Sequence, residues 1–504
     1  MAGPVIHTPN DSTAEAGNRT GYLFLITFVV ALGGLLFGYD WVVIGGAAKF
    51  YEAFFHLRDT VAVAADAGPW ERMLADFRSP TGWAQSCALL GCLGGALVSG
   101  ALGDRFGRRP VLLLSAANFL VSSLGIAFSN SPDAFIAWRI LGGVSIGLAS
   151  NLSPMYIAEI APAKRRGMLV AINQLTIVVG VLLAQIVNAR IAREVPAALA
   201  VGNANLTDAQ LAELAGTWNA THGWRLMFGA CAVPSLCFLA GMLVVPESPR
   251  WLVRAGKRDK ARAVLAKIGG DRYAGEAVAE IEASLASSQG VRISLRELLD
   301  RRVSGLLAIG IGLAVLQQWC GINVIFNYAE KIFSAAGFTT NTALVNMIGT
   351  GVVNLLFTLV ALFTVDRWGR KPLMLFGLAS LTILYVALGF CFKIHDTHPG
   401  AVSPYVFLGL VLAAIGCYAM SLAPVVWVLI SEIFPNRIRG VAMSLAVGAL
   451  WLACFILTYT FPIMKEKLGV SGTFWVYAGI CAIGFLAILR LRETKGRSLE
   501  QLER

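Results

Sequence analysis

Long apolar stretches alternate with short polar ones along most of the chain. Stretches such as Val111–Phe128 and Phe474–Leu489 contain no charged residue. Because a helix needs about 20 apolar residues to cross a bilayer, the pattern predicts a membrane protein built from many spanning helices. We expect twelve spans, with approximate limits at 21–47, 82–103, 110–128, 133–157, 168–190, 224–245, 303–334, 342–364, 372–393, 403–431, 438–461 and 472–491.

The composition agrees with this pattern and excludes the soluble classes of protein. Of the 504 residues, 57% are hydrophobic and 14% are charged, and the mean hydropathy is +0.68. Soluble domains carry about 25% charged residues, so a soluble enzyme, a nucleic-acid-binding module and a disordered chain are excluded. The nine cysteines lie in or beside apolar stretches without the spacing of metal ligands, so we expect no metal site.

The net charge of +11 reflects membrane topology rather than nucleic-acid binding. Lys and Arg gather in the loops after even-numbered spans and in the tail after the last span. Loops rich in positive charge stay in the cytoplasm. We therefore expect a multi-pass protein of the inner or plasma membrane, with both termini cytoplasmic and membrane lipid around its spans.

The polar and charged segments divide the chain into five parts. A polar tail at 1–20 precedes six spans within 21–245, and six more spans within 303–491 precede a short tail at 492–504. The linker at 246–302 is rich in charge and has apolar residues at helical spacing. This spacing predicts amphipathic helices that lie on the cytoplasmic face.

Two loop motifs recur in both halves of the chain. Asp104-Arg-Phe-Gly-Arg-Arg109 follows span two, and Asp366-Arg-Trp-Gly-Arg-Lys371 follows span eight. A glutamate that precedes a glycine by eight residues follows spans four and ten, at Glu159 and Glu432. Two motifs repeated in the same order predict an all-α fold of two six-helix halves, related by an axis along the membrane normal.

The charged residues of these loops allow two interpretations. They are either solvated topology signals, whose surface pairs contribute under about 1 kcal/mol each, or a cytoplasmic latch. In a latch they pair between helices when the cytoplasmic side is closed and separate when it opens. The duplication of both signs favours the latch. Its candidate residues are Asp104, Arg108, Glu159, Arg166, Glu247 and Arg250 in the first half, and Asp366, Arg370, Glu432 and Arg439 in the second.

An ionisable residue inside a span is costly in hydrocarbon and is therefore a functional candidate. Asp40 lies about two-thirds of the way along span one, and Arg139 lies near the start of span four. The pair is either a static ion pair between the two spans or a proton switch. In the switch, protonation of the aspartate frees the arginine and changes the packing, because a carboxyl holds its proton according to its burial and its distance from a cation.

Amide side chains gather in span seven around a glycine. Gln317, Gln318 and Asn323 flank Gly321, and amides both donate and accept hydrogen bonds without carrying charge. A ring of sugar hydroxyls needs such partners, although amides also bond neighbouring helices. Asn354 in span eight is a further candidate of this kind, and Phe37, Trp427 and Trp451 offer apolar faces to the C–H surface of a sugar or to the core.

Together these residues resemble the sugar porter family of the major facilitator superfamily over nearly the whole chain. The matching pieces are Gly34-Leu-Leu-Phe-Gly-Tyr-Asp40, both Asp-Arg-x-Gly-Arg motifs, Pro246-Glu-Ser-Pro-Arg-Trp-Leu252, Gln317-Gln318-x-x-Gly-Ile-Asn323 and Ser431-Glu-Ile-Phe-Pro435. Within the family the chain is most similar to bacterial proton-coupled xylose and hexose symporters. The resemblance implies the major facilitator fold and import of a monosaccharide by alternating access, in a monomer, with the proton as coupling ion and no cofactor.

The resemblance also assigns roles to single residues. Symporters of the family carry an acid at the position of Asp40, which favours the proton switch, and Gln174 in span five is expected to contact sugar hydroxyls. Three positions depart from the usual pattern. Asn327 replaces the aromatic residue that commonly closes the outer gate, with Tyr328 as its candidate substitute, while Val181 and Leu450 make the cavity less polar. We interpret the departures as a change in selectivity rather than a loss of transport.

Two other functions stay open at this point. A facilitative uniporter of the same fold would make Asp40 structural. A sugar sensor that does not transport is less favoured, because the tail after the last span has only about a dozen residues. An enzyme is not expected, since no nucleotide-binding loop or catalytic triad pattern occurs.

Overall fold

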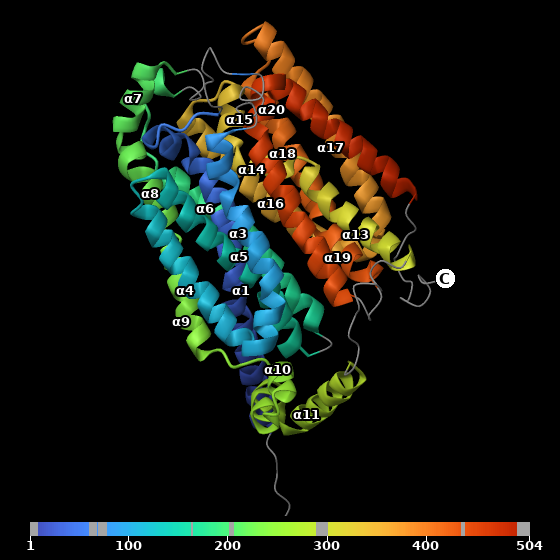
Figure 1. Ribbon diagram of the computed structural model, residues 1–504. Helices are drawn as coiled ribbons and strands as arrows, with labels where there is room; N and C mark the ends of the chain where they lie inside the picture. The colour runs from blue at the N-terminus through green and yellow to red at the C-terminus, as the bar shows by residue number, and fades with distance from the viewer. Residues whose placement is uncertain are drawn as a thin grey trace, which may run out of the picture.

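The computed structural model describes residues 9–59, 68, 78–162, 165–200, 206–288, 301–434 and 439–490. Only the backbone is described at 9–20, 197, 301–302, 366, 431–432 and 439–440. The described elements are all helices (Figure 1). Two side-by-side bundles, one from each half of the chain, form the molecule.

The first bundle contains the predicted spans one to six. Its helices are α1 (Pro9–Phe54), α3 (Pro80–Phe106), α4 (Arg108–Ala127), α5 (Pro132–Ile160) and α6 (Arg166–Ile191), and its sixth span is made of a π-helix (Asn219–Gly223), α8 (Trp224–Gly229) and α9 (Ala232–Val244). A short 3₁₀ turn (Ala197–Leu199) and α7 (Asp208–Gly216) lie between α6 and this last span. The linker forms α10 (Pro249–Arg254) and α11 (Arg258–Ser288).

The second bundle contains the predicted spans seven to twelve. Its helices are α13 (Arg301–Trp319), α14 (Ile322–Asn327), α15 (Ala329–Ala335), α16 (Thr340–Trp368), α17 (Arg370–Thr397), α18 (Pro404–Met420), α19 (Leu422–Ile433) and α20 (Arg439–Arg490). Among the described residues, 11 helical stretches are long and apolar enough to cross a membrane. The last of them breaks at Gly469 (φ 71°, ψ 173°) into two spans, which brings the number to the twelve that the sequence predicts.

Local sequence signals place the ends of several helices. Ser79 and Ser131 accept backbone N–H groups at the starts of α3 and α5, and a proline follows each serine in the first helical turn. A hydroxyl cap satisfies an N–H group that the helix itself cannot, and proline lacks the N–H that would otherwise be unpaired there. Thr339 caps α16 in the same way.

The two bundles repeat one packing scheme, as the duplicated motifs predict. In the first, α1 packs on α6, α3 on α5, and α4 on α9. In the second, α13 contacts the first part of α20 through Trp319, α16 packs on α18, and α17 packs on α20. The halves meet through α3 against α20 and α6 against α16.

The repeated Asp-Arg-x-Gly-Arg motifs adopt one backbone conformation. Gly107 separates α3 from α4 with φ 101° and ψ 163°, and Gly369 separates α16 from α17 with φ 91° and ψ 163°. Residues other than glycine rarely adopt a backbone conformation with such a positive φ. A Cβ on Gly107 would also collide with the carboxylate of Glu247, so the motif requires glycine here for two reasons.

Three spans differ from their prediction by a long extension or by an internal break. Span one, predicted to end at 47, continues to Phe54. Span seven, predicted as one helix over 303–334, breaks at Gly321 (φ 86°) and again at Tyr328. Span ten, predicted over 403–431, breaks at Ser421 (φ −120°, ψ −86°). Pro424 follows, and because it lacks an N–H it cannot continue the hydrogen bonding across this break.

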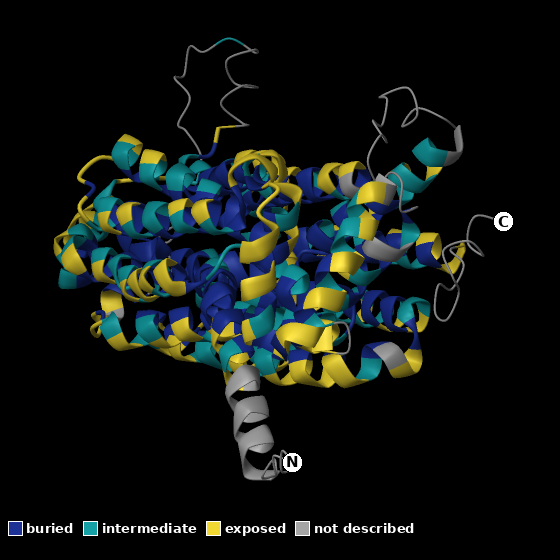
Figure 2. Ribbon diagram, turned by 90° about the horizontal axis from the view of Figure 1, so that it is seen from below, coloured by how far each residue is buried: buried dark blue, intermediate teal, exposed yellow. Residues whose placement is uncertain are grey.

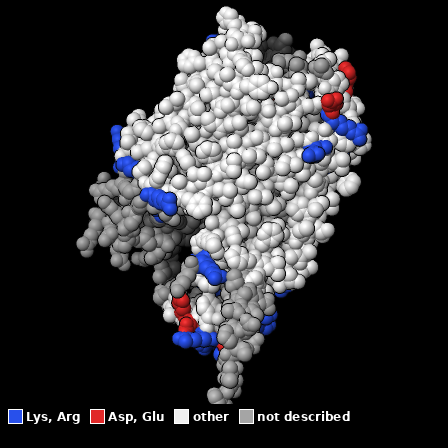
Figure 3. Space-filling model, turned by 180° about the vertical axis from the view of Figure 1, so that it is seen from behind, with Lys and Arg blue, Asp and Glu red and all other residues white. Residues whose placement is uncertain are grey.

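The outer faces of the bundles are apolar. Figure 2 shows exposed residues on the outside of the bundle and buried ones within it. The exposed set includes Val244 (77% exposed), Phe363 (71%) and Ile383 (69%). Figure 3 shows a broad face with the charged side chains toward its margins. Water-soluble monomers rarely expose so much contiguous apolar surface, whereas a membrane interior accommodates it. The molecule is a multi-pass membrane protein.

Candidate functional site

Asp40 on α1 and Arg139 on α5 form an ion pair inside the first bundle. Arg139 Nη1 donates to both carboxylate oxygens of Asp40, at 2.8 Å each, and both side chains are at least nine-tenths buried. The ring of Phe228 lies 5.4 Å from the guanidinium carbon of Arg139. The structure thus brings together the two ionisable residues that the sequence singled out, and each compensates the other's buried charge.

The amides of span seven lie at its break. Asn323 Nδ2, in α14, donates to Gln318 Oε1 at the end of α13. Gln317 Nε2 donates to the carbonyl oxygens of Leu422 (3.3 Å) and Ala423 (3.2 Å). Those carbonyls belong to the first turn of α19, directly after the break in span ten. The interruptions of spans seven and ten therefore support each other, in the way that membrane proteins place irregular backbone inside the protein.

The other sugar-site candidates are distributed around these helices. The ring of Phe37 on α1 lies 5.7 Å from that of Trp451 on α20, and Trp41 lies 6.1 Å from Trp451. Trp427 on α19 is 38% exposed. Gln174 on α6 is half-buried and Asn354 on α16 is buried. The side-chain amide of neither residue makes a hydrogen bond with the described part of the chain. Phe37 and Trp451 thus join the halves through an aromatic contact.

The predicted gate residues lie at the end of the molecule that carries α7 and α15, opposite the linker end with α10 and α11 (Figure 1). Tyr328 is buried between α14 and α15. Its hydroxyl donates to the carbonyl of Thr458 at 2.8 Å, and its ring lies 4.5 Å from that of Phe461. Asn327 is the last residue of α14 and is 4% exposed. Both lie where the second bundle meets α1.

A charge cluster at this end was missed by the sequence reasoning. Lys331 on α15 contacts Glu52 of α1 at 3.1 Å and Asp59 at 2.9 Å, and Asp59 also contacts Lys465 of α20 at 3.2 Å. We call these four residues the closing cluster. It joins the two halves, and Lys49 adds a hydrogen bond from α1 to Thr340 of α16 (2.7 Å).

Opposite charges hold Asp59 and Lys331 of the closing cluster in their ionised forms. Burial alone would raise the pKa of Asp59, but Lys331 and Lys465 hold that pKa well below its usual range. Burial likewise would lower the pKa of Lys331, but Asp59 and Glu52 raise it above the usual range. Both groups therefore stay charged over the physiological pH range.

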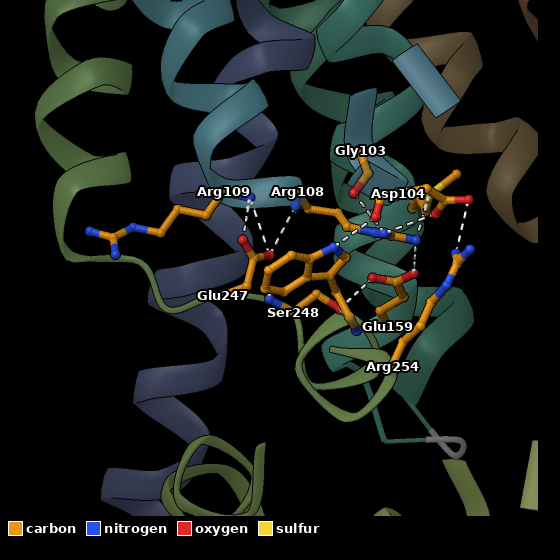
Figure 4. A network of polar contacts seen from close by, with 10 residues as sticks. Gly103, Asp104, Arg108, Arg109, Glu159, Glu247, Ser248 and Arg254 are labelled. Carbon is orange, nitrogen blue, oxygen red and sulfur yellow. Dashed lines mark hydrogen bonds and ion pairs between the residues drawn. The ribbon is translucent and has the colours of Figure 1, made fainter. Parts of the chain in front are cut away.

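A second network lies at the linker end (Figure 4). Arg108 contacts Asp104 at 3.1 Å and Glu159 at 3.0 Å, and Asp104 also pairs with Arg254 of α10 at 2.9 Å. Ser248 donates its hydroxyl to Glu159. These contacts join α3, α4 and α5 to the start of the linker, all within the first half.

Glu247 caps the start of α4 in the same network. Its carboxylate accepts the backbone N–H groups of Arg108 (2.9 Å), Arg109 (3.3 Å) and Ser248 (2.7 Å). Burial raises the pKa of Glu247, although these hydrogen bonds and Arg108 oppose the increase. A carboxylate at a helix N-terminus also has a favourable interaction with the helix dipole.

The remaining latch candidates have other positions. Arg166 and Arg250 are exposed and form no ion pair with the described residues, and Arg254 rather than Arg250 reaches Asp104. Arg370 is half-buried at the start of α17. The side chains of Asp366, Glu432 and Arg439 lie outside the described part. A latch between the two halves stays a prediction.

No group of His, Cys, Asp or Glu that could hold a metal ion occurs among the described residues. The site contains instead a buried charge pair, paired amides at two helix breaks and an aromatic contact between the halves.

The sequence is similar to those of known transport proteins. The sequence model of the family described as sugar (and other) transporter matches residues 26–504. The D-xylose-proton symporter of Escherichia coli is 39% identical over 513 residues, which cover 96% of each chain. The glucose transport protein of Synechocystis is 37% identical over 504 residues, 98% of this chain and all of the relative. The chain belongs to the sugar transporter family. It is therefore a transporter and not an enzyme.

The fold of this sugar transporter also matches a solved one. A structure of the E. coli xylose transporter, described as a partially occluded inward-open conformation, has a TM-score of 0.77 at 36% identity and covers 95% of this chain and all of its own. The family match and the structural match both support the major facilitator fold that the sequence predicts.

The contacts between the halves of this transporter identify which end is closed. At the α7 end, the closing cluster, Tyr328, and Trp83 against Phe455 (6.1 Å) all bridge the halves. At the linker end, the ion pairs printed in Figure 4 stay within the first half. In the described part, α5 and α19, the equivalent helices of the two halves, show no extended packing on each other.

Proposed function

We propose that this transporter imports a monosaccharide together with a proton, by alternating access across a cell's inner or plasma membrane. The observation that carries the proposal is the Asp40–Arg139 pair. A carboxylate and a guanidinium removed from water are stable only together. Protonation of Asp40 would remove its charge and weaken its hold on Arg139, so α1 and α5 would repack as the proton binds and leaves.

The amides and aromatic rings support a sugar as the cargo. Gln317, Gln318 and Asn323 lie at helix breaks, where discontinuous helices of transporters form binding sites. Phe37 and Trp451 add apolar faces beside them. The relatives named above are described as carriers of xylose and of glucose, so the proposal stops at the class of monosaccharides.

The two ends of the molecule support alternating access. The closing cluster and Tyr328 hold the halves together at the α7 end, whereas no comparable set of ion pairs between the halves lies among the described residues of the linker end. The contacts among the described residues therefore close the gate at the α7 end. In this proposal the closed end faces outward, and the cargo exits past the linker.

Orientation, lipid contact and oligomeric state are further parts of the proposal. Arginines gather at the linker end, including Arg105, Arg108, Arg109 and Arg254, and such an excess favours a cytoplasmic location. Both termini then lie in the cytoplasm, and lipid covers the apolar outer faces. A single chain supplies both halves and every candidate residue, which supports a monomer.

The test is sugar accumulation against a gradient. Purified protein in liposomes receives labelled D-xylose or D-glucose while an inward proton gradient is imposed. Symport predicts accumulation that a protonophore abolishes and that Asp40→Asn lacks. Asp133→Asn, which changes an exposed carboxylate in the first turn of α5, should accumulate sugar as the unchanged protein does. Equilibration without accumulation would instead support a uniporter.

A further inference from the structure

A small cavity touches the Asp40–Arg139 pair. It is lined by these two residues, by Gln85 of α3, by Asn327 of α14 and by apolar side chains of α1, α3 and α5. Its free space is about what one water molecule needs, and a sugar ring does not fit. We call it the chamber.

The polar residues of the chamber have unmet hydrogen-bonding capacity. Gln85 is 3% exposed, and neither Oε1 nor Nε2 has a partner among the described residues. Asn327 Oδ1 and Arg139 Nε are also buried without a partner there. Buried amides without partners are rare and costly. A water with two to four polar partners is the usual solution, and the chamber offers both donors and acceptors.

The chamber has walls from both halves of the transporter. Asp40, Gln85 and Arg139 belong to the first bundle, and Asn327 is the one lining residue from the second. Asn327 directly precedes the gate residue Tyr328. When α14 and α15 move away from α1 to open the outer end, Asn327 leaves with them, and the chamber opens on that side.

We propose that Gln85 and Asn327 are positioning residues that hold a water molecule against the Asp40–Arg139 pair, through which Asp40 receives its proton from outside. A hydronium ion outside gives one proton to the bound water, and the water gives another to a carboxylate oxygen of Asp40. One O–H bond forms and one breaks at the water, which is unchanged. Asp40 becomes neutral, and Arg139 keeps its charge.

The proposal rests on the proposed proton symport, and the surroundings of Asp40 agree with it. The other titratable groups that face the pair are Tyr39 and Tyr51 on α1, Cys87 and Cys92 on α3, and Cys231 directly before α9. Tyrosine and thiol groups are neutral near pH 7, so Arg139 is the one charged group facing Asp40 among these. A bound water supplies the proton path that these neutral groups do not.

The test compares two activities of one preparation. Proteoliposomes are assayed for sugar accumulation driven by a proton gradient and for sugar exchange at equal pH on both sides, using whichever of D-xylose and D-glucose the unchanged protein accumulates. Exchange needs no net proton movement. For Gln85→Leu and Asn327→Leu, we expect the ratio of accumulation to exchange to fall about tenfold, as for the loss of one hydrogen bond that supports the proton-accepting group.

Matched variants separate this role from packing. Asn327→Ser keeps a group that can donate to and accept from a water, so its ratio should stay within about twofold of that of the unchanged protein. Ser86, next to Gln85 on α3, has a buried hydroxyl that does not line the chamber. Ser86→Ala should therefore also keep the ratio of the unchanged protein. The proposal is overturned if all four variants show the same ratio of accumulation to exchange, or if Ser86→Ala loses as much of this ratio as the two leucine variants do.

The outcomes also separate the two levels of the account. If the unchanged protein shows no proton-driven accumulation, the proposed symport fails. If it accumulates sugar and Gln85→Leu and Asn327→Leu keep its ratio, only the chamber's role fails. Two independent leucine variants keep the test usable when one of them does not fold.

Discussion

At the scale of single residues, the buried pair of Asp40 and Arg139 has an asymmetry. A carboxylate that loses its cation can take up a proton and become neutral, whereas a guanidinium cannot give one up in a protein. Removal of Asp40 therefore leaves a permanent buried charge, and removal of Arg139 leaves a charge that pH can cancel. Since both oxygens of Asp40 receive a hydrogen bond from Arg139, either change also leaves polar atoms unpaired.

This asymmetry predicts a pH-dependent stability difference. Loss of one partner of a buried pair costs about 3–5 kcal/mol, so Asp40→Asn and Arg139→Gln should each lower the Tm in detergent. The loss in Arg139→Gln should shrink as the pH falls, because Asp40 then becomes neutral, and the loss in Asp40→Asn should not. Thermal unfolding of both variants and of the double variant, which should recover part of the loss, measures this. Identical pH profiles for the two single variants would contradict it.

At the scale of elements, the breaks in spans seven and ten form the site. Gly321 has φ 86°, and Gln317 binds the carbonyls that follow the break at Ser421. In an unbroken span seven, the amides would lie along one face of the helix. The breaks instead turn polar backbone and side chains toward the interior.

Gly321→Ala should therefore cost more than its size suggests. A left-handed backbone at a residue with a Cβ costs about 1–2 kcal/mol, and the added carbon would lie 2.7 Å from the ring of Tyr477. We expect a lower Tm and lost sugar uptake. Gly312→Ala on α13 is the control, because a Cβ there meets no atom within 4 Å and alanine favours a helix by about 0.5–1 kcal/mol. A Gly321→Ala variant with the Tm and uptake of Gly312→Ala would refute the requirement.

Some elements were predictable from the sequence and others were not. The repeated Gly107 and Gly369 motifs predicted the duplication, because a local backbone requirement leaves a local signature. With span one predicted to end at 47, Lys49 and Glu52 fall in the polar segment after it, where mixed charge normally indicates exposed chain. They are buried in α1 because their partners, Thr340 and Lys331, come from the other half. The missing hydrogen-bond partners of the Gln85 amide could likewise not be predicted, because they depend on which side chains the neighbouring helices place around it.

At the scale of the whole molecule, the closing cluster keeps one end shut. Because the pKa of Asp59 is depressed and that of Lys331 is raised, the contribution of their pair is lost only when the pH falls well below the usual aspartate range or rises above the usual lysine range. Between about pH 5 and 8, Asp59 and Lys331 therefore keep their charges.

Lys331→Gln should open this end of the molecule. The variant leaves Glu52 and Asp59 without their shared cation, which favours separation of the halves. Double electron–electron resonance between spin labels at the exposed positions Glu213 and Leu468 should show a population with a longer distance than in the unchanged protein. Lys393→Gln, which changes an exposed lysine of α17, should keep the original distance. If both variants keep it, the cluster does not hold the gate.

The central claim is that sugar and proton move together through Asp40. The most direct measurement adds D-xylose or D-glucose to proteoliposomes that contain a pH-sensitive dye, with no gradient imposed. The account predicts acidification inside on addition of the transported sugar, and no acidification in Asp40→Asn. Entry of labelled sugar into liposomes of the unchanged protein without any change in internal pH would contradict it and leave Asp40 and Arg139 as a structural pair.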